Sequence, residues 1–584
     1  MNNKSEIILI SMPFFDYRLP SAQLAVLKGY LNKENISTLC IHAYLDFYEC
    51  IGEEYIDLIN NYEYAEYFFI KFAYPERYAL KRREINHQLQ KDLKLSKRML
   101  MNFYARISNF IDDIVNKIEN QNCDLIAFSI TYKQLLPSIC VAKKLKNNKT
   151  GKKILFGGSR VSGELGNGIF SKEKCVDSIL SGEGEYILKD YIDDYYRNAH
   201  DGRIISNEFI EAQEPVDLET LPVPDFDDYI RESSKYGINN GKVLIFYEVA
   251  RGCWWNRCTF CSSRRLYKNY REKTPNKVAN DLRNLLERYD TSSVWLLGDC
   301  YTFNSYLKLS RLMSEYVGKC QFMIYSRCSS NFKYYEALKK MGATSIIVGI
   351  EALSDSLLKK MDKGCDTIRN IQCLKYCTQL QLGCTYNLFY GYPNFSHQDY
   401  IETLHNIDFV LGYQPPESLC DMELQYGSHV YHDQKGFEIC ASAPDRKEMM
   451  ILPDGAKTFI YECKTLRVHT KYSKKIIQRV MQWNKVYEKE GSALLTYQIV
   501  DGIVQITDKR KMGWGNKRKY SLTEDESKIF IMCEKITSRQ LLENKLPGVD
   551  ISSILKKLNK MKILFLTGKE CLSIPIRMER DGNK

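Results

Sequence analysis

Three cysteines in one loop constrain this chain more than any other feature. Cys253, Cys258 and Cys261 lie within nine residues, directly after the apolar run 243–249, which predicts a β-strand. Three thiolates at this spacing can hold three irons of a [4Fe–4S] cluster, because such clusters are bound mainly through cysteine sulfur. The next cysteine along the chain is Cys300. The loop therefore predicts a cluster with one iron left open to bind a group that is not protein.

A zinc knuckle, or a set of buried structural thiols, is the alternative interpretation of this loop. Structural zinc sites close with four protein ligands, often as two Cys-x-x-Cys pairs. Only Cys258 and Cys261 form such a pair here, and no histidine lies near them in the sequence. The spacing favours the cluster, while the two other interpretations stay open at this point.

The 584 residues are enough for three domains, each with its own core. Residues 1–200 alternate strands and helices, with a tyrosine-rich helical insertion at about 50–120, and predict an open parallel sheet with a Rossmann-like order. Ligands of such sheets bind at the carboxyl ends of the strands. Residues 201–240 contain two closely spaced prolines and predict an extended linker.

The alternation resumes after the linker. Residues 241–470 contain repeated strand–helix units and predict a full or partial (β/α) barrel with its site at the strand carboxyl ends. Residues 471–584 contain two predicted helices, 522–534 and 551–561, followed by a short hairpin. This last pattern predicts a small winged-helix-like domain, so the expected fold class is α/β throughout the first two domains.

Composition limits the compartment and the partners. The 20 cysteines are scattered, many of them in apolar runs, which fits a reducing cytoplasm better than a secreted disulfide framework. No run is long enough to cross a membrane, and no secretory signal is present at the start of the sequence. The net charge of +11 is spread along the chain rather than blocked. We therefore expect a cytoplasmic protein that binds neither a membrane nor nucleic acid.

Several motifs in a fixed order carry a family resemblance. Arg-Gly-Cys-Trp-Trp at 251–255 opens the cysteine loop, and Val-Gly-Ile-Glu-Ala-Leu-Ser at 348–354 is followed by Met361 and Lys363-Gly364. Asn-Leu-Phe-Tyr-Gly-Tyr-Pro stands at 387–393. Together with Gln-Pro-Pro at 414–416 and the glycine loops of the first 200 residues, these motifs resemble a radical SAM enzyme (SAM is S-adenosylmethionine) with an N-terminal cobalamin-binding domain. The chain most resembles the radical SAM C-methyltransferases that mature ribosomally made peptides.

The resemblance implies a set of binding residues. The cluster would be held by the three loop cysteines. SAM contacts are implied for Phe260, Asp299, Ser326, Arg327, Glu351 and Leu388. Cobalamin contacts are implied for Met12, Pro13, Ser129, Tyr132, Gln134, Gly157, Gly158, Gly182, Glu183 and Gly184, in loops whose glycines would let the backbone approach a large planar ligand. For Phe260 loop packing, and for Asp299, Arg327 and Glu351 a salt bridge at the barrel rim, are the structural alternatives.

The chain departs from the family pattern in two respects. Four residues separate Cys253 from Cys258, where radical SAM enzymes generally have three. The Asp-x-His-x-x-Gly motif is missing, so no lower histidine ligand to cobalt is predicted. No second cysteine motif of the cluster type is present near the C-terminus, and one iron–sulfur cluster is predicted.

The resemblance also implies the reaction. One SAM would be cleaved reductively to generate a radical at an unactivated carbon, and a second SAM would supply methyl through cobalamin. The partners would be a precursor peptide and a reductant such as flavodoxin or ferredoxin. A non-methylating oxidation, cyclisation or rearrangement, a small-molecule substrate, and a non-catalytic cobalamin sensor or scaffold are the alternatives. The C-terminal domain either binds the leader of the peptide or caps the barrel.

Overall fold

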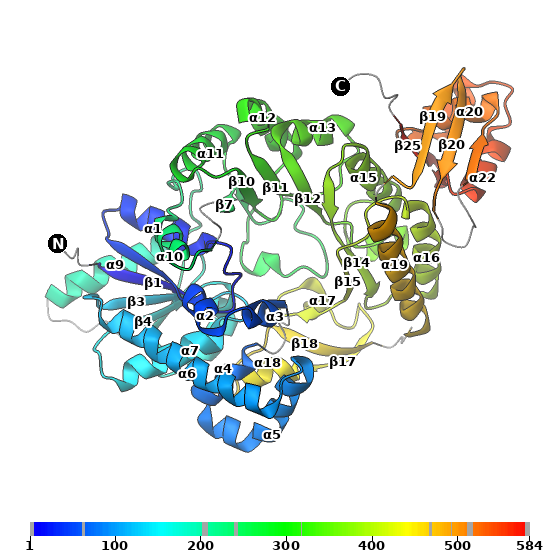
Figure 1. The fold of residues 1–584 in the computed structure, drawn as a ribbon. Helices are drawn as coiled ribbons and strands as arrows, with labels where there is room; N and C mark the ends of the chain where they lie inside the picture. Colours follow the sequence, from blue (N-terminus) through cyan, green and yellow to red (C-terminus); the bar gives the residue numbers. More distant parts are fainter. Residues whose placement is uncertain are drawn as a thin grey trace. The chain divides into compact units, whose positions relative to one another are not determined.

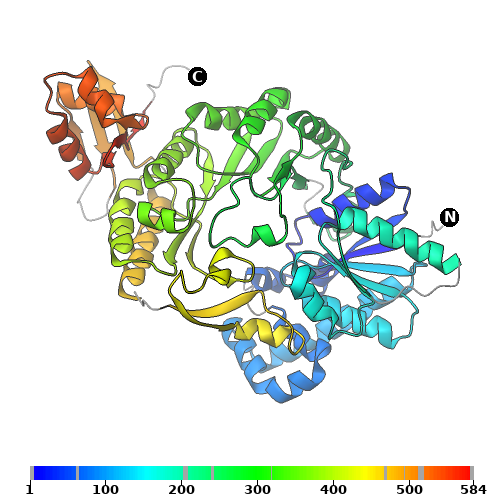
Figure 2. The same ribbon diagram turned by 180° about the vertical axis from the view of Figure 1, so that it is seen from behind.

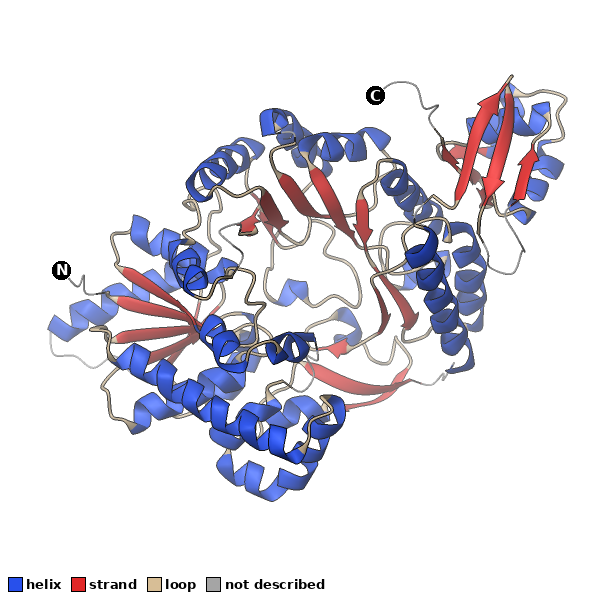
Figure 3. Cartoon of the chain, viewed as in Figure 1, coloured by secondary structure: helices blue, strands red, loops and turns tan. Residues whose placement is uncertain are grey.

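The computed structural model describes residues 5–60, 65–200, 208–238, 243–316, 318–465, 470–491, 493–510 and 518–578. The chain divides into two compact units. One contains residues 1–247, 280–295 and 443–462, and the other contains residues 248–279, 296–442 and 463–584. Figures 1 and 2 follow the chain from both sides, and Figure 3 separates its helices from its strands.

The first unit is built on a six-stranded parallel sheet. Its strands are β1 (Ile7–Ser11), β2 (Thr38–His42), β3 (Leu125–Ser129), β4 (Lys153–Gly157), β5 (Ser178–Ser181) and β6 (Glu208–Glu211), in the spatial order β2-β1-β3-β4-β5-β6. The strand order reverses between β1 and β3. In open parallel sheets this switch point is where ligands bind, at the carboxyl ends of the strands.

Both faces of this sheet are buried, as alternation along β1 demonstrates. Ile7 and Leu9 belong to one core cluster, and Ile8 and Ile10 to the other, because successive side chains of a strand point to opposite faces. The first face is covered by α1 (Ala22–Lys33) and α9 (Gly184–His200), and the second by α2 (Ala43–Ile51), α6 (Lys97–Glu119) and α7 (Leu135–Asn147). The rainbow colouring of Figure 1 shows these two helical layers on either side of the blue and cyan strands.

The helical insertion between β2 and β3 has the predicted character. Its remaining helices are α3 (Glu54–Asn60), α4 (Tyr67–Ala73) and α5 (Pro75–Asp92). Aromatic rings hold these helices together: the ring of Phe47 on α2 meets those of Phe69 on α4 and Phe110 on α6 at 5.8 and 4.8 Å between centroids. Residues 61–64 of the predicted insertion lie outside the described residues. The unit also contains α8 (Gly163–Phe170).

The segment predicted as an extended linker contains two ordered elements. It contributes β6 to the sheet and then forms α10 (Asp227–Lys235); its residues 201–207 and 239–240 lie outside the described part of the chain. Helix α10 packs against β2, an edge strand whose outer N–H groups have no neighbouring strand. Asp228 Oδ2 accepts from the Cys40 N–H at 2.8 Å, and Glu232 Oε2 accepts from the His42 N–H at 3.0 Å.

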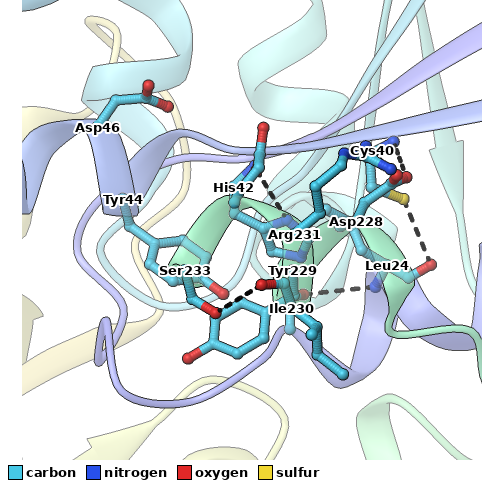
Figure 4. Close-up of polar contacts among 12 residues, drawn as sticks. Leu24, Cys40, His42, Tyr44, Asp46, Asp228, Tyr229, Ile230, Arg231 and Ser233 are labelled. Atoms are coloured by element: carbon cyan, nitrogen blue, oxygen red, sulfur yellow. Dashed lines mark hydrogen bonds and ion pairs between the residues drawn. The ribbon is translucent and has the colours of Figure 1, made fainter. Parts of the chain in front are cut away.

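Figure 4 shows this contact, with Asp228 of α10 beside Cys40 of β2. The two carboxylates satisfy buried donors that would otherwise lack a partner, which is costly. Lys28 and Lys117 balance their charges, with Nζ 2.8 Å from Asp228 and 3.0 Å from Glu232. Proline spacing could not reveal this helix, because its anchoring residues are carboxylates paired with lysines far away in the sequence.

The strands after residue 243 form a partial (β/α) barrel. β7 (Ile245–Glu248), β10 (Ser293–Leu297), β11 (Gln321–Ser326), β12 (Ala343–Val348) and β13 (Gly383–Thr385) make a sheet of order β13-β12-β11-β10-β7. A parallel pair, β14 (Asn387–Gly391) and β15 (Ser418–Asp421), continues from it through a bridge between Glu351 and Leu388. The helices of this region are α11 (Pro275–Tyr289), α12 (Phe303–Leu312), α13 (Phe332–Met341), α14 (Asp355–Lys360), α15 (Thr367–Gln379) and α16 (His397–Val410).

Smaller elements complete this part of the chain. They are β8 (Ala250–Arg251), β9 (Arg271–Glu272), β16 (Leu424–Gln425), α17 (His429–His432), β17 (Ile439–Pro444), α18 (Arg446–Ile451), β18 (Ile460–Thr465) and α19 (Thr470–Glu490). β8 pairs with β9 across the cysteine loop. The barrel strands coincide with hydrophobic runs of the sequence, and along β10 and β11 buried residues alternate with partly exposed ones.

The C-terminal region contains the predicted helices and hairpin, together with a sheet that the sequence analysis missed. The helices are α20 (Glu524–Met532), α21 (Arg539–Lys545) and α22 (Ile551–Lys560), and the hairpin is β23 (Leu564–Leu566) with β24 (Glu570–Ser573), joined by β22 (Thr537–Ser538). The additional sheet contains β19 (Leu495–Val500), β20 (Ile503–Asp508), β21 (Arg518–Ser521) and β25 (Ile576–Arg577). The winged-helix assignment stays a prediction.

Candidate functional site

The cysteine loop begins at the carboxyl end of the first barrel strand, where a (β/α) barrel places its chemistry. The loop is fixed by the turn that follows α14. Trp255 Nε1 donates to the Asp362 carbonyl at 2.6 Å, and the Thr259 N–H donates to the Met361 carbonyl at 3.0 Å. Gly364, with φ +69°, leaves space for the Trp255 ring, since a Cβ at that position would lie 2.1 Å from the indole. These contacts connect the cysteines to the Met-x-Lys-Gly motif.

The three loop thiols lie in one electrostatic environment. Burial raises the pKa of the Cys258 thiol, and the cations of Lys363 and Arg327 oppose that rise. Cys261 and Cys253 raise the same pKa further, because negative charge on a neighbouring thiol disfavours a second thiolate. Each thiolate of a four-iron cluster binds a different iron, so the loop need not bring its sulfurs around a single point. Three soft donors with two adjacent cations fit an anionic iron–sulfur cluster.

Lys363 and Glu351 form a buried ion pair beside this loop. Lys363 Nζ lies 3.1 Å from Glu351 Oε1, and the two side chains are 8% and 13% exposed. Burial lowers the pKa of Lys363, but the charges of Glu351 and Cys258 and the hydrogen bond to Glu351 outweigh it, and the pKa is raised. The lysine therefore stays protonated near the cluster cysteines. Glu351 adopts a left-handed φ of +61°, and Gly349 leaves the space that the pair occupies.

The structure places Arg327 against the cysteine loop. Its guanidinium lies 5.2 and 4.9 Å from the ring centroids of Trp254 and Trp255, and it donates to the Lys363 carbonyl. In this position Arg327 supports the loop. One N–H of the guanidinium is used by that carbonyl, and the predicted bidentate contact of Arg327 with the SAM carboxylate stays a prediction.

Ser326 is also directed into the protein. The side chain is buried, its Oγ donates to the Arg327 carbonyl at 2.8 Å, and it lies 2.9 Å from the Tyr334 hydroxyl on α13. Sequence reasoning placed Ser326 at a strand end but could not decide which side of the strand its side chain occupies. A SAM contact through this hydroxyl does not agree with its packing.

Three further residues predicted for SAM lie around the barrel opening. Asp299 is exposed at the surface, but the protein around its carboxyl displaces water. This desolvation raises the pKa of the carboxyl despite a hydrogen bond from Ser263. Phe260 is half-buried, with its ring 5.3 Å from that of Phe389 and 5.6 Å from Lys363 Nζ. Leu388 is buried, so only its backbone, which bridges to Glu351, remains near the site.

The residues predicted for cobalamin all lie at the carboxyl edge of the first sheet: Ser129 and Gly157 end β3 and β4, Gly184 begins α9, and the others are in the loops after β1, β3, β4 and β5. Tyr132 is 45% exposed, as a ligand contact requires. Met12 and Pro13 are buried. Gln134 is 1% exposed and connects two loops: Nε2 donates to the Met12 carbonyl at 2.5 Å, and Oε1 accepts from Thr131 Oγ1 at 2.7 Å. Its role is to position the loops, because its amide has no group left for a ligand.

The glycines of this edge are explained by the protein itself. A Cβ on Gly158, where φ is +107°, would lie 2.5 Å from the Ile130 carbonyl oxygen. A Cβ on Gly182, where φ is +112°, would lie 2.9 Å from the Ala212 side chain. Gly157 and Gly184 make looser contacts, and Glu183 accepts a hydrogen bond from the Val216 N–H at 3.2 Å. These glycines permit a close approach between neighbouring loops, and their contact with a planar ligand stays a prediction.

Sequence reasoning missed the supporting residues of the cysteine loop. Lys363 was noticed only as part of a motif, and Trp254 and Trp255 only as neighbours of Cys253. Cys300 was set aside as distant in sequence, yet its backbone bridges to that of Cys253, and its Sγ accepts from Trp254 Nε1 at 3.0 Å. The available signal was the pair of tryptophans in the cysteine loop together with Arg327 directly after β11, a combination that favours cation–π contacts.

Comparisons with known proteins agree with this geometry. Residues 247–407 match the radical SAM superfamily, so the chain contains a radical SAM domain. It is 24% identical over 314 residues to an uncharacterized methyltransferase of Pyrococcus horikoshii, covering 50% of this chain and 65% of that protein. It is 22% identical over 317 residues to the anaerobic magnesium-protoporphyrin IX monomethyl ester cyclase of Cereibacter sphaeroides, covering 50% of each. The match spans less than two thirds of either relative.

Two solved structures share the fold. The cobalamin-dependent S-adenosylmethionine radical enzyme OxsB, with aqua-cobalamin and S-adenosylmethionine bound, aligns with a TM-score of 0.57 at 13% identity, over 96% of this chain and 75% of that one. The radical S-adenosylmethionine methyltransferase TsrM of Kitasatospora setae, with cobalamin and a [4Fe–4S] cluster bound, aligns with a TM-score of 0.51 at 11% identity, over 82% and 91%. The α/β architecture of a parallel sheet and a radical SAM barrel is therefore shared with cobalamin-containing radical SAM enzymes.

Within the residues that the structure describes, no helix combines the length and the apolar composition that a membrane span requires.

Proposed function

We propose that this protein is a cobalamin-dependent radical SAM enzyme that C-methylates an unactivated carbon of a ribosomally synthesised precursor peptide. The observation that carries the proposal is the cysteine loop held against the buried Lys363–Glu351 pair within a radical SAM domain. Three cysteines supply three ligands, and the motif that supports them supplies positive charge.

This chain's own residues have distinct parts in the proposal. Cys253, Cys258 and Cys261 would hold the cluster, which when bound supplies the electron for reductive cleavage of SAM. Glu351 and Asp299 are carboxylates near the barrel opening and suit the amino group or ribose of SAM, and Phe260 suits its adenine. Lys363 and Arg327 hold the loop and keep two positive charges beside it. Such charges favour the reduced, more negative state of a cluster.

Cobalamin is proposed for the carboxyl edge of the first sheet. The switch point between β1 and β3 lies there, and Tyr132 is an exposed aromatic side chain beside it. The fold shared with OxsB supports this assignment. When bound, cobalamin would carry the methyl group, and the missing histidine motif means that no side chain is proposed as its lower ligand.

Methylation is supported by the motif resemblance and by the Pyrococcus relative, which is named a methyltransferase. The peptide substrate rests on the motif resemblance alone. The cyclase relative supports the second candidate, a non-methylating radical reaction such as a cyclisation. A precursor peptide, a flavodoxin or ferredoxin reductant and a cytoplasmic location complete the proposal. The C-terminal region is proposed to bind the leader of the peptide along a strand edge.

Product mass separates the two candidates. The reconstituted enzyme is incubated anaerobically with reductant, cobalamin, SAM carrying a trideuterated methyl group, and the peptide encoded beside its gene. Methylation replaces one peptide hydrogen by CD3, whereas oxidation or cyclisation removes two hydrogens and a rearrangement leaves the mass unchanged. A product without the deuterium label would overturn the methylation proposal and favour the second candidate.

A further inference from the structure

A second group of three thiols lies in the barrel, separate from the cysteine loop. Cys373 and Cys377 are on α15, and Cys384 is in the centre of β13. Their Sγ atoms all lie within 4.8 Å of one another. Among the residues that the structure describes, this is the one group of three histidine, cysteine or carboxylate side chains that converges so closely. None of the three side chains is more than 1% exposed.

Local structure explains why these sulfurs meet. Residues four apart on a helix lie on the same face, so Cys373 and Cys377 are neighbours on the side of α15 that faces the sheet. The turn after the helix is short, with Gln381 at a left-handed φ of +52°, and it brings β13 back under the helix. β13 is the edge strand of its sheet, and Gln414 Oε1 fixes it by accepting from the Cys384 N–H at 2.9 Å.

The spacing suits a single metal ion. A tetrahedral zinc with Zn–S bonds of about 2.3 Å holds its sulfurs about 3.8 Å apart. Sulfurs that already lie within 4.8 Å reach that arrangement through displacements of about an ångström or less. A ligand set made only of thiolates selects soft ions such as Zn²⁺ or Cu⁺, and a bound cation offsets the charge that thiolates would otherwise bring into the core.

A path to the site exists. A pocket of about 300 Å³ is lined by Cys377 and Cys384, together with Thr378, Gln414 and Tyr487. A metal site needs an entry path of this kind as well as its ligands. A fourth thiol belongs to Cys328, whose Sγ donates to Asn370 Oδ1 on α15 at 3.0 Å.

We propose that Cys373, Cys377 and Cys384 bind one soft, thiophilic metal ion through three thiolates and thereby fasten α15 to β13. This site goes beyond the proposed function and does not depend on it. The alternative is that the three thiols pack as small apolar groups, as buried cysteines often do. The two explanations differ in whether the folded protein retains metal other than iron.

Metal analysis decides between them. The anaerobically reconstituted full chain is incubated with Zn²⁺, freed of unbound metal by gel filtration, and analysed for iron and zinc. We expect about one zinc per chain in addition to the cluster iron. Cys384→Ser and Cys377→Ser each lower the zinc at least fivefold and leave the iron unchanged. Cys140→Ser, which alters a buried thiol of α7, retains both metals.

Two further measurements keep the proposal open to refutation even if a serine variant fails to fold. In the wild-type protein, zinc X-ray absorption should give three sulfur neighbours. In Cys253→Ala the zinc should remain while the iron is lost. No zinc retained by the wild type, equal zinc in the serine variants, or zinc lost together with iron in Cys253→Ala would each overturn the proposal.

Discussion

Lys363 Nζ lies 3.1 Å from Glu351 Oε1, and this buried pair joins the turn after α14, which holds the cysteine loop, to the motif that follows β12. The buried Lys363 ammonium is stabilised in its protonated form, because its partner is a carboxylate and the nearby Cys258 also raises its pKa. We infer that the pair serves both the folding of the loop and the electrostatics of the bound cluster.

Replacing Lys363 should therefore affect stability and reduction together. Lys363→Met leaves Glu351 buried without its partner, which costs about 3–5 kcal/mol. We expect a midpoint potential of the cluster more negative than in the wild type and at least a tenfold slower formation of 5′-deoxyadenosine, with partial rescue by Lys363→Arg. Lys360→Met is the matched control, since it removes a lysine paired with the buried Asp399 at 2.5 Å. A potential equally shifted in both variants would contradict the role of Lys363.

Gly364 tests whether the turn positions the cysteines. Gly364→Ala places a Cβ 2.1 Å from the Trp255 ring and forces the loop to move. We expect less than half the wild-type iron content after reconstitution. Gly548→Ala introduces the same backbone strain, at φ +85°, with no atom within 4 Å, and should keep its iron. Equal losses in the two variants would point to strain alone.

The contact between α10 and β2 predicts a specific pH dependence. Burial would raise the pKa of Glu232, but the hydrogen bond from His42 and the charge of Lys117 lower it to about 2 from about 4.5. A carboxyl with a depressed pKa stabilises the fold at pH values above 4.5, and this stabilisation is lost as the pH falls from 4.5 toward 2. At neutral pH it amounts to about 3 kcal/mol.

Glu232→Gln should therefore lower the urea midpoint of unfolding at pH 7, and the difference from the wild type should shrink below pH 4.5. The exposed Glu53 provides the control, because Glu53→Gln removes a carboxylate of the same unit without a buried partner. A difference that stays constant between pH 7 and pH 3.5 would show that the ionisation of Glu232 contributes little.

Tyr132 tests the proposed cobalamin edge. Its ring is 45% exposed, so Tyr132→Ala should leave thermal stability within about 1 kcal/mol of the wild type. We expect at least a fivefold loss of cobalamin retained after gel filtration, measured from its visible absorbance. Met99→Ala removes an equally exposed side chain on α6 and should retain cobalamin. Unchanged retention in Tyr132→Ala would place the ligand elsewhere.

The sequence was informative where the physical signal is local. The apolar runs at 7–11, 38–42, 153–157 and 293–297 became β1, β2, β4 and β10, because buried parallel strands are continuously hydrophobic. The candidate loops followed from the strand ends, since ligand sites of such folds lie there. The radical SAM domain was predicted from a family resemblance, which several motifs in a fixed order carry.

Other features depend on contacts between distant residues. The sequence next to Asp228 and Glu232 does not indicate that these carboxylates accept hydrogen bonds from the backbone N–H groups of β2. The sequence next to Ser326 likewise does not indicate that its hydroxyl contacts Tyr334. Gln134 was predicted to meet a ligand but is used entirely by neighbouring loops. The convergence of Cys384 with the α15 thiols likewise requires the tertiary fold, although the helical spacing of Cys373 and Cys377 was visible in the sequence.

The measurement that tests the central claim most directly is an anaerobic incubation of the reconstituted protein with SAM, hydroxocobalamin and reductant, in which 5′-deoxyadenosine and S-adenosylhomocysteine are quantified; the reductant converts the cobalamin to the form that can accept methyl from SAM. We predict both products from the wild type and from Cys140→Ala, and no 5′-deoxyadenosine from Cys253→Ala. A wild-type protein that holds zinc in place of iron in the cysteine loop, or 5′-deoxyadenosine formed equally by Cys253→Ala, would contradict the claim.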